Sequence, residues 1–303
     1  MSYVCVECGG PLAVETSVAF ADGPRHHTAQ CDYAPYERHV MPNGSVCFYL
    51  DSTHTYHTKI TRKNGKWVGQ GRWGDLPSPS QIAKFADPSA DNLMDWAARK
   101  NLEGLYLLGG GIEAYPDAQT LYEALREKKL TWRDLREKAG DKGTEVHDAF
   151  EKGLHGEPVP LEDNLPSVQG HMIALDKFFN DHPSLGLLQT EAVVYSEKHG
   201  YAGRFDARVL GRGGTVLLDL KTSKYISRSY HAQLQGYDLA AEECGYGASD
   251  NLTILQTRED GTYRLWPCRS SRQTFLDCLS LYRAGKETDA QTKEDFKQLK
   301  AAA

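Results

Sequence analysis

The sequence predicts an α/β (α+β) protein with a small N-terminal zinc-knuckle-like module. In the second half of the chain, segments with the alternating pattern of strands lie between segments with the periodicity of helices. Hydrophobic residues make up 40% of the 303 residues, which is enough for a sizeable core. Near the start, Cys5 and Cys8 form a Cys-x-x-Cys-Gly sequence, the tight turn with which two thiolates grip one metal ion.

Two more zinc-ligand candidates, His27 and Cys31, follow this knuckle. Together with Cys5 and Cys8 they predict a structural zinc site of the Cys-x-x-Cys…His-x-x-x-Cys type. The alternative is a pair of reduced cysteines at a mobile end of the chain. The seven cysteines of the chain have irregular spacing and do not resemble a disulfide framework, which favours a reducing cytoplasm.

Strand patterns come next, followed by helical patterns. Val46–Leu50 and Lys66–Gly69 are short runs bounded by turn residues and predict strands. Apolar residues at helical spacing predict a helix at Asn92–Lys100 and another at Thr120–Lys129. A third helix is expected at Thr131–Ala139, where the threonine is a good N-cap.

A new helix is predicted from Gly140 onward, and it carries a histidine at the edge of its apolar stripe. The stripe contains Val146 and Phe150, and His147 lies about 100° from Val146 around the helix axis. A histidine at such a position is more often an ordinary core-edge residue than a ligand. It can, however, reach a metal ion held by nearby carboxylates. A further helix is predicted at Ser167–Asn180.

Three strands follow this helix in the prediction. The first, Leu187–Tyr195, contains Glu191. The second and third, Tyr201–Leu210 and Thr215–Lys221, pair across a Gly-rich hairpin loop at Gly211–Gly214.

The hairpin places two aspartates opposite one another. With Leu210 facing Thr215, counting outward pairs Asp206 with Asp219, whose Cβ atoms would lie about 5 Å apart. Like charges at that distance are destabilising, so we expect a proton, a neighbouring cation or a divalent metal ion to offset them. Lys221 shares a strand face with Asp219. From the hairpin alone, a metal site and a solvated face with a salt bridge from Lys221 stay equally open.

A helix at Ser229–Cys244 follows the hairpin, and Gln233 and Tyr237 lie one turn apart on it. The predicted elements after it are two strands and an amphipathic helix, at Asn251–Thr257, Thr262–Pro267 and Ser271–Lys286. The last residues, rich in Lys, Gln and Ala, are expected to form a frayed end.

Five short motifs, taken in order, resemble those of the PD-(D/E)XK nuclease superfamily. They are Gly-Thr-x-Val-His, a strand glutamate, Gly-Arg-Phe-Asp, Asp-Leu-Lys and Gln-x-x-x-Tyr, at Gly143–His147, Glu191, Gly203–Asp206, Asp219–Lys221 and Gln233–Tyr237. The resemblance spans Asp141–Trp266 and is closest to the RecB-like branch, which includes phage recombination exonucleases. It implies a restriction-endonuclease-like core, a central mixed β-sheet flanked by helices.

The resemblance divides the chain into four expected regions. Residues 1–44 would form the zinc-binding N-terminal module, and residues 45–139 the N-terminal strand and helix region of the nuclease. Residues 140–290 would form the PD-(D/E)XK nuclease core. Residues 291–303 would form a flexible tail.

The resemblance also implies roles for individual residues. The catalytic residues would be Glu191, Asp206, Asp219 and Lys221. The metal ligands would be His147, Asp206, Asp219 and the backbone carbonyl of Leu220. Mostly oxygen ligation favours Mg²⁺ or Mn²⁺. Expected DNA contacts come from the helix motif and from nearby basic side chains, namely Gln233, Tyr237, Arg204, Lys224 and Arg228.

Three features of the whole chain bear on cofactor, partner and compartment. Wide spacing of Cys244, Cys268 and Cys278 disfavours the iron–sulfur cluster found in some relatives of this superfamily. A net charge of −6 argues against a protein that coats nucleic acid, but it leaves room for local basic patches. The start of the chain lacks a secretory pattern, so we expect a cytoplasmic protein, in the host cytoplasm if it is phage-encoded.

The function expected from the resemblance is that of a metal-dependent deoxyribonuclease. A phage-type exonuclease for recombination or repair, working with a single-strand annealing or recombination protein, is the first expectation. The alternatives are an endonuclease of the same superfamily and a non-catalytic DNA-binding assembly protein. The retained set of Asp206, Asp219 and Lys221 argues against the non-catalytic alternative.

The zinc prediction is tested by metal analysis of the purified protein. We expect the full chain to contain about one zinc per molecule by plasma emission spectroscopy, because four ligands close a structural site. Replacing both Cys5 and Cys8 by serine should remove that zinc, whereas Cys278→Ser should retain it. Equal zinc content in the wild type and the double variant would overturn the prediction.

Overall fold

The computed structural model of the protein describes residues 35–64, 66–70, 76–87, 90–161 and 166–302, together with short pieces at 3–4, 11–12, 17–18 and 26–27. The chain divides into two compact units that interleave in sequence. The first comprises Met1–Ser78, Val193–Gly203 and Leu239–Ala248. The second comprises Pro79–Ala192, Arg204–Asp238 and Ser249–Ala303. The four regions expected from the sequence stay a prediction.

The first unit contains short antiparallel strands around aromatic residues. Its three-stranded sheet consists of β5 (Glu37–Val40), β6 (Val46–Leu50) and β7 (Thr55–His57). Tyr49 and Tyr56 are both buried, and their ring centroids lie 5.0 Å apart. The remaining strands form two-stranded pairs, namely β1 (Tyr3–Val4) with β2 (Pro11–Leu12), β3 (Ser17–Val18) with β4 (His26–His27), and β8 (Lys59–Lys63) with β9 (Lys66–Gln70).

The predicted zinc module cannot be compared with this unit. Cys5, Cys8 and Cys31 lie outside the described residues. Only the backbone of His27, in β4, is described. The zinc site therefore stays a prediction.

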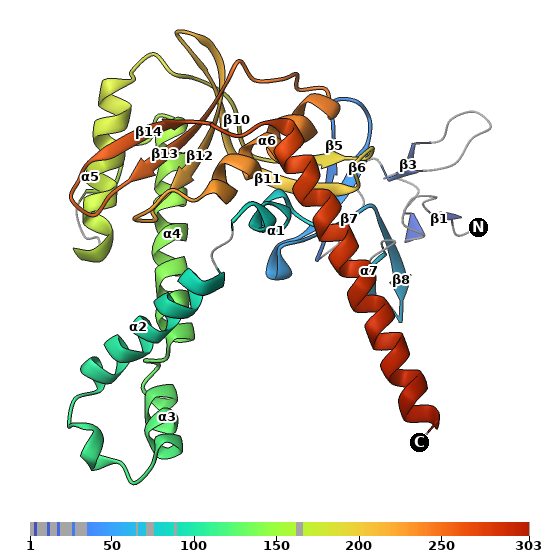
Figure 1. The fold of residues 1–303 in the computed structure, drawn as a ribbon. Coiled ribbons are helices and arrows are strands. Elements are labelled where there is room, and N and C mark those ends of the chain that lie inside the picture. The colour runs from blue at the N-terminus through green and yellow to red at the C-terminus, as the bar shows by residue number, and fades with distance from the viewer. Residues whose placement is uncertain are drawn as a thin grey trace. The chain divides into compact units, whose positions relative to one another are not determined.

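A five-stranded mixed sheet with helices against it lies largely in the second unit (Figure 1). The strands, in spatial order, are β10 (Gly186–Ser196), β11 (Tyr201–Gly211), β12 (Gly214–Lys221), β13 (Asn251–Thr257) and β14 (Tyr263–Pro267). β12 pairs antiparallel with β11 and parallel with β13, and β13 pairs antiparallel with β14. The parallel pair requires a crossover connection, which helix α6 (Arg228–Glu243) provides. The mixed α/β class expected from the sequence is confirmed.

The hairpin between β11 and β12 has the predicted register. Leu210 faces Thr215, and the ladder continues from there to Ala207 opposite Leu218, one step short of Asp206 and Asp219. The turn is tighter than the four-residue loop that the sequence predicted, because Gly211 and Gly214 still pair. Gly214 has φ +103°, a conformation that costs glycine little. Register and strand faces are unaffected by this difference.

Two helices cover one face of the sheet. Helices α4 (Trp132–Leu154) and α5 (Pro166–Asp181) pack against β11, β12 and β13. Their contact with the sheet includes Phe150, Phe178 and Leu220, each at most 1% exposed. Burying apolar side chains of this size contributes about 1.5–3 kcal/mol each relative to leaving them exposed. This core fixes α4, and therefore the histidine it carries, relative to the strands.

The predicted break between two helices at residue 140 is wrong, because α4 is continuous across it. Thr131 and Asp134 form a reciprocal capping box that starts the helix at Trp132. Gly140 and Gly143 lie inside the helix with ordinary backbone conformation. Each glycine costs about 1 kcal/mol relative to alanine, an amount that packing of the downstream apolar stripe offsets. The expected region boundary at 139/140 falls within this helix.

The C-terminal helix is also longer than predicted. Helix α7 runs from Arg272 to Ala302, whereas the sequence placed its end at Lys286 and a flexible tail at 291–303. Side-chain bonds along the helix, such as Gln291 to Asp295 at 2.8 Å, support the extension. The remaining described helical segments are η2 (Asp51–Thr53), α1 (Pro79–Ala83), η3 (Lys84–Ala86), α2 (Ala90–Leu108), η4 (Ile112–Ala114) and α3 (Ala118–Glu127). Of these, α2 extends well beyond the predicted Asn92–Lys100.

Among the described residues, no helix combines the length and apolar character that crossing a membrane requires.

Two helical glycines of the second unit should respond oppositely to alanine. A Cβ on Gly170 in α5 would overlap the backbone carbonyl of Glu259, so Gly170→Ala should lower the free energy of unfolding by about 2–3 kcal/mol. A Cβ on Gly140 in α4 meets nothing, so Gly140→Ala should raise it by about 0.5–1 kcal/mol. Urea unfolding monitored by circular dichroism measures both. Equal effects would contradict the close approach of α5 to Glu259.

Candidate metal centre

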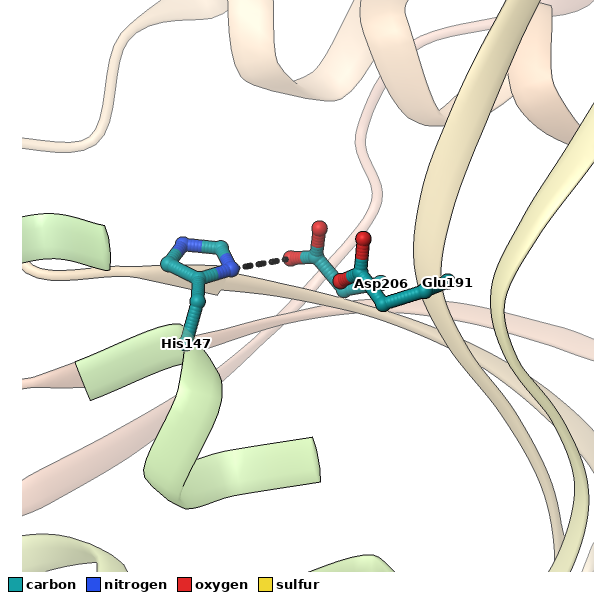
Figure 2. A group of neighbouring side chains, drawn as sticks. All are labelled: His147, Glu191 and Asp206. Carbon is teal, nitrogen blue, oxygen red and sulfur yellow. Dashed lines mark ion pairs between the residues drawn. The ribbon is translucent and has the colours of Figure 1, made fainter. Parts of the chain in front are cut away.

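Three potential ligands from three separate elements converge in the second unit. His147 comes from α4, Glu191 from β10 and Asp206 from β11. One ligand atom from each lies within 4.8 Å of the other two. Figure 2 shows the imidazole and both carboxylates directed into the same space. His147 Nδ1 lies 3.6 Å from Asp206 Oδ2.

Each element presents its ligand for a local reason. His147 follows the fully buried Val146, so it stands at the rim of the face that α4 buries. In β11, Phe205 and Ala207 are buried and the intervening Asp206 points to the other face. Glu191 is a departure from regular strand geometry, because its φ is +45°. Left-handed backbone at a non-glycine residue costs about 1–3 kcal/mol and persists only where the surroundings impose it.

Asp206 is anchored on both its side chain and its backbone. Its Oδ2 accepts a hydrogen bond from the backbone N–H of Leu220 at 2.6 Å. Its backbone carbonyl accepts one from the hydroxyl of Thr190 at 3.1 Å. The first bond ties the carboxylate to β12, and the second ties β11 to β10 beside Glu191. Asp206 is therefore held between the two strands that carry the other acidic residues.

A second group of polar side chains surrounds Asp219. Its side chain is 2% exposed, and its Oδ2 forms an ion pair with Lys221 Nζ at 2.5 Å. Its Oδ1 accepts a hydrogen bond of 3.0 Å from Gln233, whose amide also donates to the Tyr237 hydroxyl at 3.4 Å. The Asp219 carboxylate thus connects β12 to α6. Beyond the Lys221 ion pair, Oδ2 has no hydrogen-bond donor among the described residues.

Lys221 is held from three sides. Besides its pair with Asp219, Nζ donates to the carbonyl of Leu220 at 3.2 Å. It also lies 5.1 Å from the ring centroid of Tyr230 on α6, within cation–π range. These contacts fix the ammonium group beside the Leu220 carbonyl that was predicted as a metal ligand.

Two carboxyl groups of the site, those of Glu191 and Asp219, have raised pKa values. Burial, and then the negative charge of Asp206, raises the pKa of Glu191 to about 7, against a partial lowering by Arg204. Burial also raises the pKa of Asp219 to about 6, although the Lys221 ammonium opposes that shift. Burial lowers the pKa of Lys221, but Asp219 and Asp206 outweigh it, so the net shift is upward. Lys221 is therefore a cation at neutral pH.

The predicted site residues fall into two adjoining groups. The ligand cluster contains His147 and Asp206, as expected, and Glu191 in place of Asp219. Asp219 instead pairs with Lys221, and both groups meet at Leu220. The metal and catalytic roles of these residues stay predictions.

The predicted DNA contacts lie on different parts of the site. Gln233 and Tyr237 both belong to the Asp219 network. Arg204 Nε forms an ion pair with Glu191 Oε2 at 2.8 Å, a partner that the sequence did not predict. Lys224 and Arg228 are exposed, and the Lys224 ammonium lies 5.5 Å from the Tyr225 ring centroid. Their contacts with DNA stay predictions.

Two further residues support the site and were missed from the sequence. Tyr230 precedes Gln233 by three residues, so helical spacing would have placed it on the same face. Gln256 in β13 is 3% exposed and donates to the carbonyls of Ser223 and Lys224 at 2.7 and 3.1 Å. It thereby fixes the loop that follows Lys221. Only the pairing of β12 with β13 reveals this role.

The ligand cluster fits a divalent cation. Two carboxylates and an imidazole within 4.8 Å of one another have the spacing of side chains that share one ion. The raised pKa of Glu191 shows that this space penalises a further negative charge, a cost that a bound cation removes. Oxygen-rich ligation favours Mg²⁺ or Mn²⁺ over thiophilic metals.

Comparison with protein families and with curated protein sequences finds no match. Among solved structures, the fold is similar to a protein from Eubacterium rectale described as a "Putative exonuclease", with a TM-score of 0.32 and 16% identity. The similarity covers 51% of this chain and 66% of that chain. At this TM-score the likeness carries no argument about the function of either site.

The raised pKa of Glu191 predicts a pH-dependent stability in the metal-free protein. The folded state keeps a proton on Glu191 up to about pH 7, whereas the ordinary value is 4.5. That contribution is complete below pH 4.5 and is lost as pH rises through 7. In EDTA, the free energy of unfolding of the wild type minus that of Glu191→Gln should therefore fall by about 1–2 kcal/mol between pH 5 and 8.

Urea unfolding of both proteins at each pH measures this difference, in which titrating groups that do not interact with Glu191 cancel. Mg²⁺ or Mn²⁺ should stabilise the wild type more at pH 8 than at pH 5, because protons compete with the cation. A difference that is flat or rises with pH would contradict the placement of Glu191.

Proposed function

We propose that this protein is a Mg²⁺- or Mn²⁺-dependent deoxyribonuclease that acts as an exonuclease in recombination or repair. The observation that supports this most is the convergence of His147, Glu191 and Asp206 beside the buried Asp219–Lys221 pair. A cation-binding cluster next to a fixed ammonium group suits chemistry on a phosphodiester, whose transition state gains negative charge.

The chain supplies the ligands and holds their geometry. His147, Glu191 and Asp206 would bind the metal ion, and the Leu220 carbonyl and Asp219 border the same space. When bound, the ion would polarise a phosphate oxygen and lower the pKa of a coordinated water. The Leu220 N–H holds the Asp206 carboxylate in place, so ligand orientation does not depend on the metal.

Lys221 is the proposed electrostatic catalyst. Asp219 and Asp206 keep it protonated, and Asp219, Leu220 and Tyr230 restrict its ammonium group to one position. An ammonium at the edge of the ligand cluster would stabilise charge on the attacked phosphate or orient the attacking water. Gln233 does not contact Lys221 in this proposal but positions its partner, by donating a hydrogen bond to Asp219.

Action on DNA ends, and a place beside an annealing protein, come from the sequence resemblance to RecB-like and phage exonucleases. The resemblance rests on the ordered motifs from Gly143 to Tyr237, which the fold assembles around one sheet. We propose the exonuclease activity on that basis, with DNA as substrate.

The proposal is tested with end-labelled linear duplex and closed circular DNA in Mg²⁺ or Mn²⁺. The wild type should degrade the linear DNA from its ends and leave the circle intact. Asp219→Ala and Lys221→Ala should each reduce the rate by about 100-fold or more, because each removes part of the fixed charge arrangement. DNA binding, measured in EDTA, should stay close to the wild type.

Lys198→Ala is a matched control that removes an exposed lysine outside this site and should keep full activity. Cleavage of the closed circular DNA would show that the protein is an endonuclease and would refute the exonuclease proposal. Undiminished degradation of linear DNA by both Asp219→Ala and Lys221→Ala would refute the site itself.

A further inference from the structure

The C-terminal half of α7 is exposed along its described residues. Residues 283–298 and Lys300 are exposed, on all sides of the helix. An isolated helix of this length is marginal in water, and most protein helices are stabilised by a buried apolar face. This half of the long red helix of Figure 1 therefore has no buried apolar face among its described residues.

Charge is segregated around this part of the helix. Four lysines, at Lys286, Lys293, Lys297 and Lys300, are spaced seven, four and three residues apart. At about 100° per residue, these positions fall within an arc of about 60°. Asp295 projects from the opposite side of the axis, Glu287 and Glu294 stand about 90–110° from the centre of the lysine stripe, and Asp289 stands at one edge of it.

The lysine stripe is largely uncompensated. Lys297 lies 3.7 Å from Glu294, but both side chains are more than half exposed, so the pair contributes little. Lys286 and Lys300 lie over the rings of Tyr282 and Phe296 at 5.6 and 5.3 Å. Lys286, Lys293 and Lys300 have no acidic partner among the described residues.

We propose that the lysine stripe of α7 binds the phosphate backbone of duplex DNA. The proposal rests on the proposed function for the identity of the polyanion. The stripe is about 21 Å long at about 1.5 Å per residue. Each strand of duplex DNA carries one phosphate for about every 3.4 Å of its axis, so the stripe has the length of about six phosphates of one backbone.

The alternative partners fit the helix less well. A helix that lies on a membrane requires a continuous apolar face. In this half of α7, Phe296 is the one large exposed hydrophobic side chain among the described residues. A second copy of this chain, whose net charge is −6, offers weaker complementarity than a polyanion with regular spacing.

The test measures binding of a fluorescein-labelled duplex by anisotropy in EDTA, where no cleavage occurs, over a series of salt concentrations. The variant K286Q/K293Q/K297Q/K300Q removes four phosphate contacts and keeps a residue with good helix propensity. The slope of log K against log salt should become less steep by about 3–4, and affinity at low salt should fall at least tenfold.

The matched control moves charge without removing it. In Q291K/K293Q/K297Q/Q298K, net charge and composition are unchanged, but two lysines leave the stripe. The salt slope of this control should change by about half as much as the slope of the quadruple glutamine variant. Circular dichroism of each variant checks that α7 remains helical.

Identical salt slopes for the wild type and the quadruple variant would overturn the proposal. Lysine-dependent binding to vesicles with about 30% phosphatidylserine that is stronger than binding to DNA would also overturn it. Such vesicles carry the order of surface charge that recruits basic helices. The nuclease assay in Mg²⁺ is read separately. Stripe-dependent DNA binding without cleavage would refute the proposed function alone, and cleavage with unchanged slopes would refute the stripe alone.

Discussion

Repulsion among closely spaced carboxylates is the constraint on which the site depends. Glu191, Asp206 and Asp219 come from three adjacent strands and share a small, partly desolvated volume. The Lys221 ammonium beside Asp219 and Arg204 beside Glu191 offset this repulsion, and the raised pKa values of Glu191 and Asp219 let protons offset it further at lower pH. A divalent cation would replace the protons. The cost of assembling the carboxylates therefore favours a positive charge among them.

The rest of the fold supplies rigidity for that assembly. α4 is fixed by Phe150 and its neighbours in the core, so His147 meets the strands in one position. Helix α6, the crossover between the parallel strands, carries Gln233, which donates to Asp219, and Tyr230, whose ring lies beside the Lys221 ammonium. Gln256, from the neighbouring strand, restrains the loop after Lys221. Each ligand is thus positioned by an element whose own placement is set by apolar packing or by the sheet.

The sequence predicts what depends on local pattern and misses what depends on distant contacts. Alternation and a tight turn were enough for the register of Leu210 with Thr215, and so for Asp206 near Asp219. Gly140 predicts a helix end, because the free-energy cost of a glycine in a helix is visible in the local sequence. The packing that offsets this cost involves residues distant in the sequence. The left-handed conformation of Glu191 and its ion pair with Arg204 do not follow from the sequence, because the alternating pattern of β10 predicts regular strand geometry at that position.

The backbone of Leu220 joins the two halves of the site. Its N–H, in the peptide bond with Asp219, donates to Asp206, and its carbonyl, in the peptide bond with Lys221, accepts from the Lys221 ammonium. The amide proton of Leu220 is consequently a spectroscopic reporter placed by the fold at the centre of the site. Its resonance frequency and its exchange with solvent deuterium follow the charge on Asp206 directly, and they register occupancy by any cation without a substrate being present.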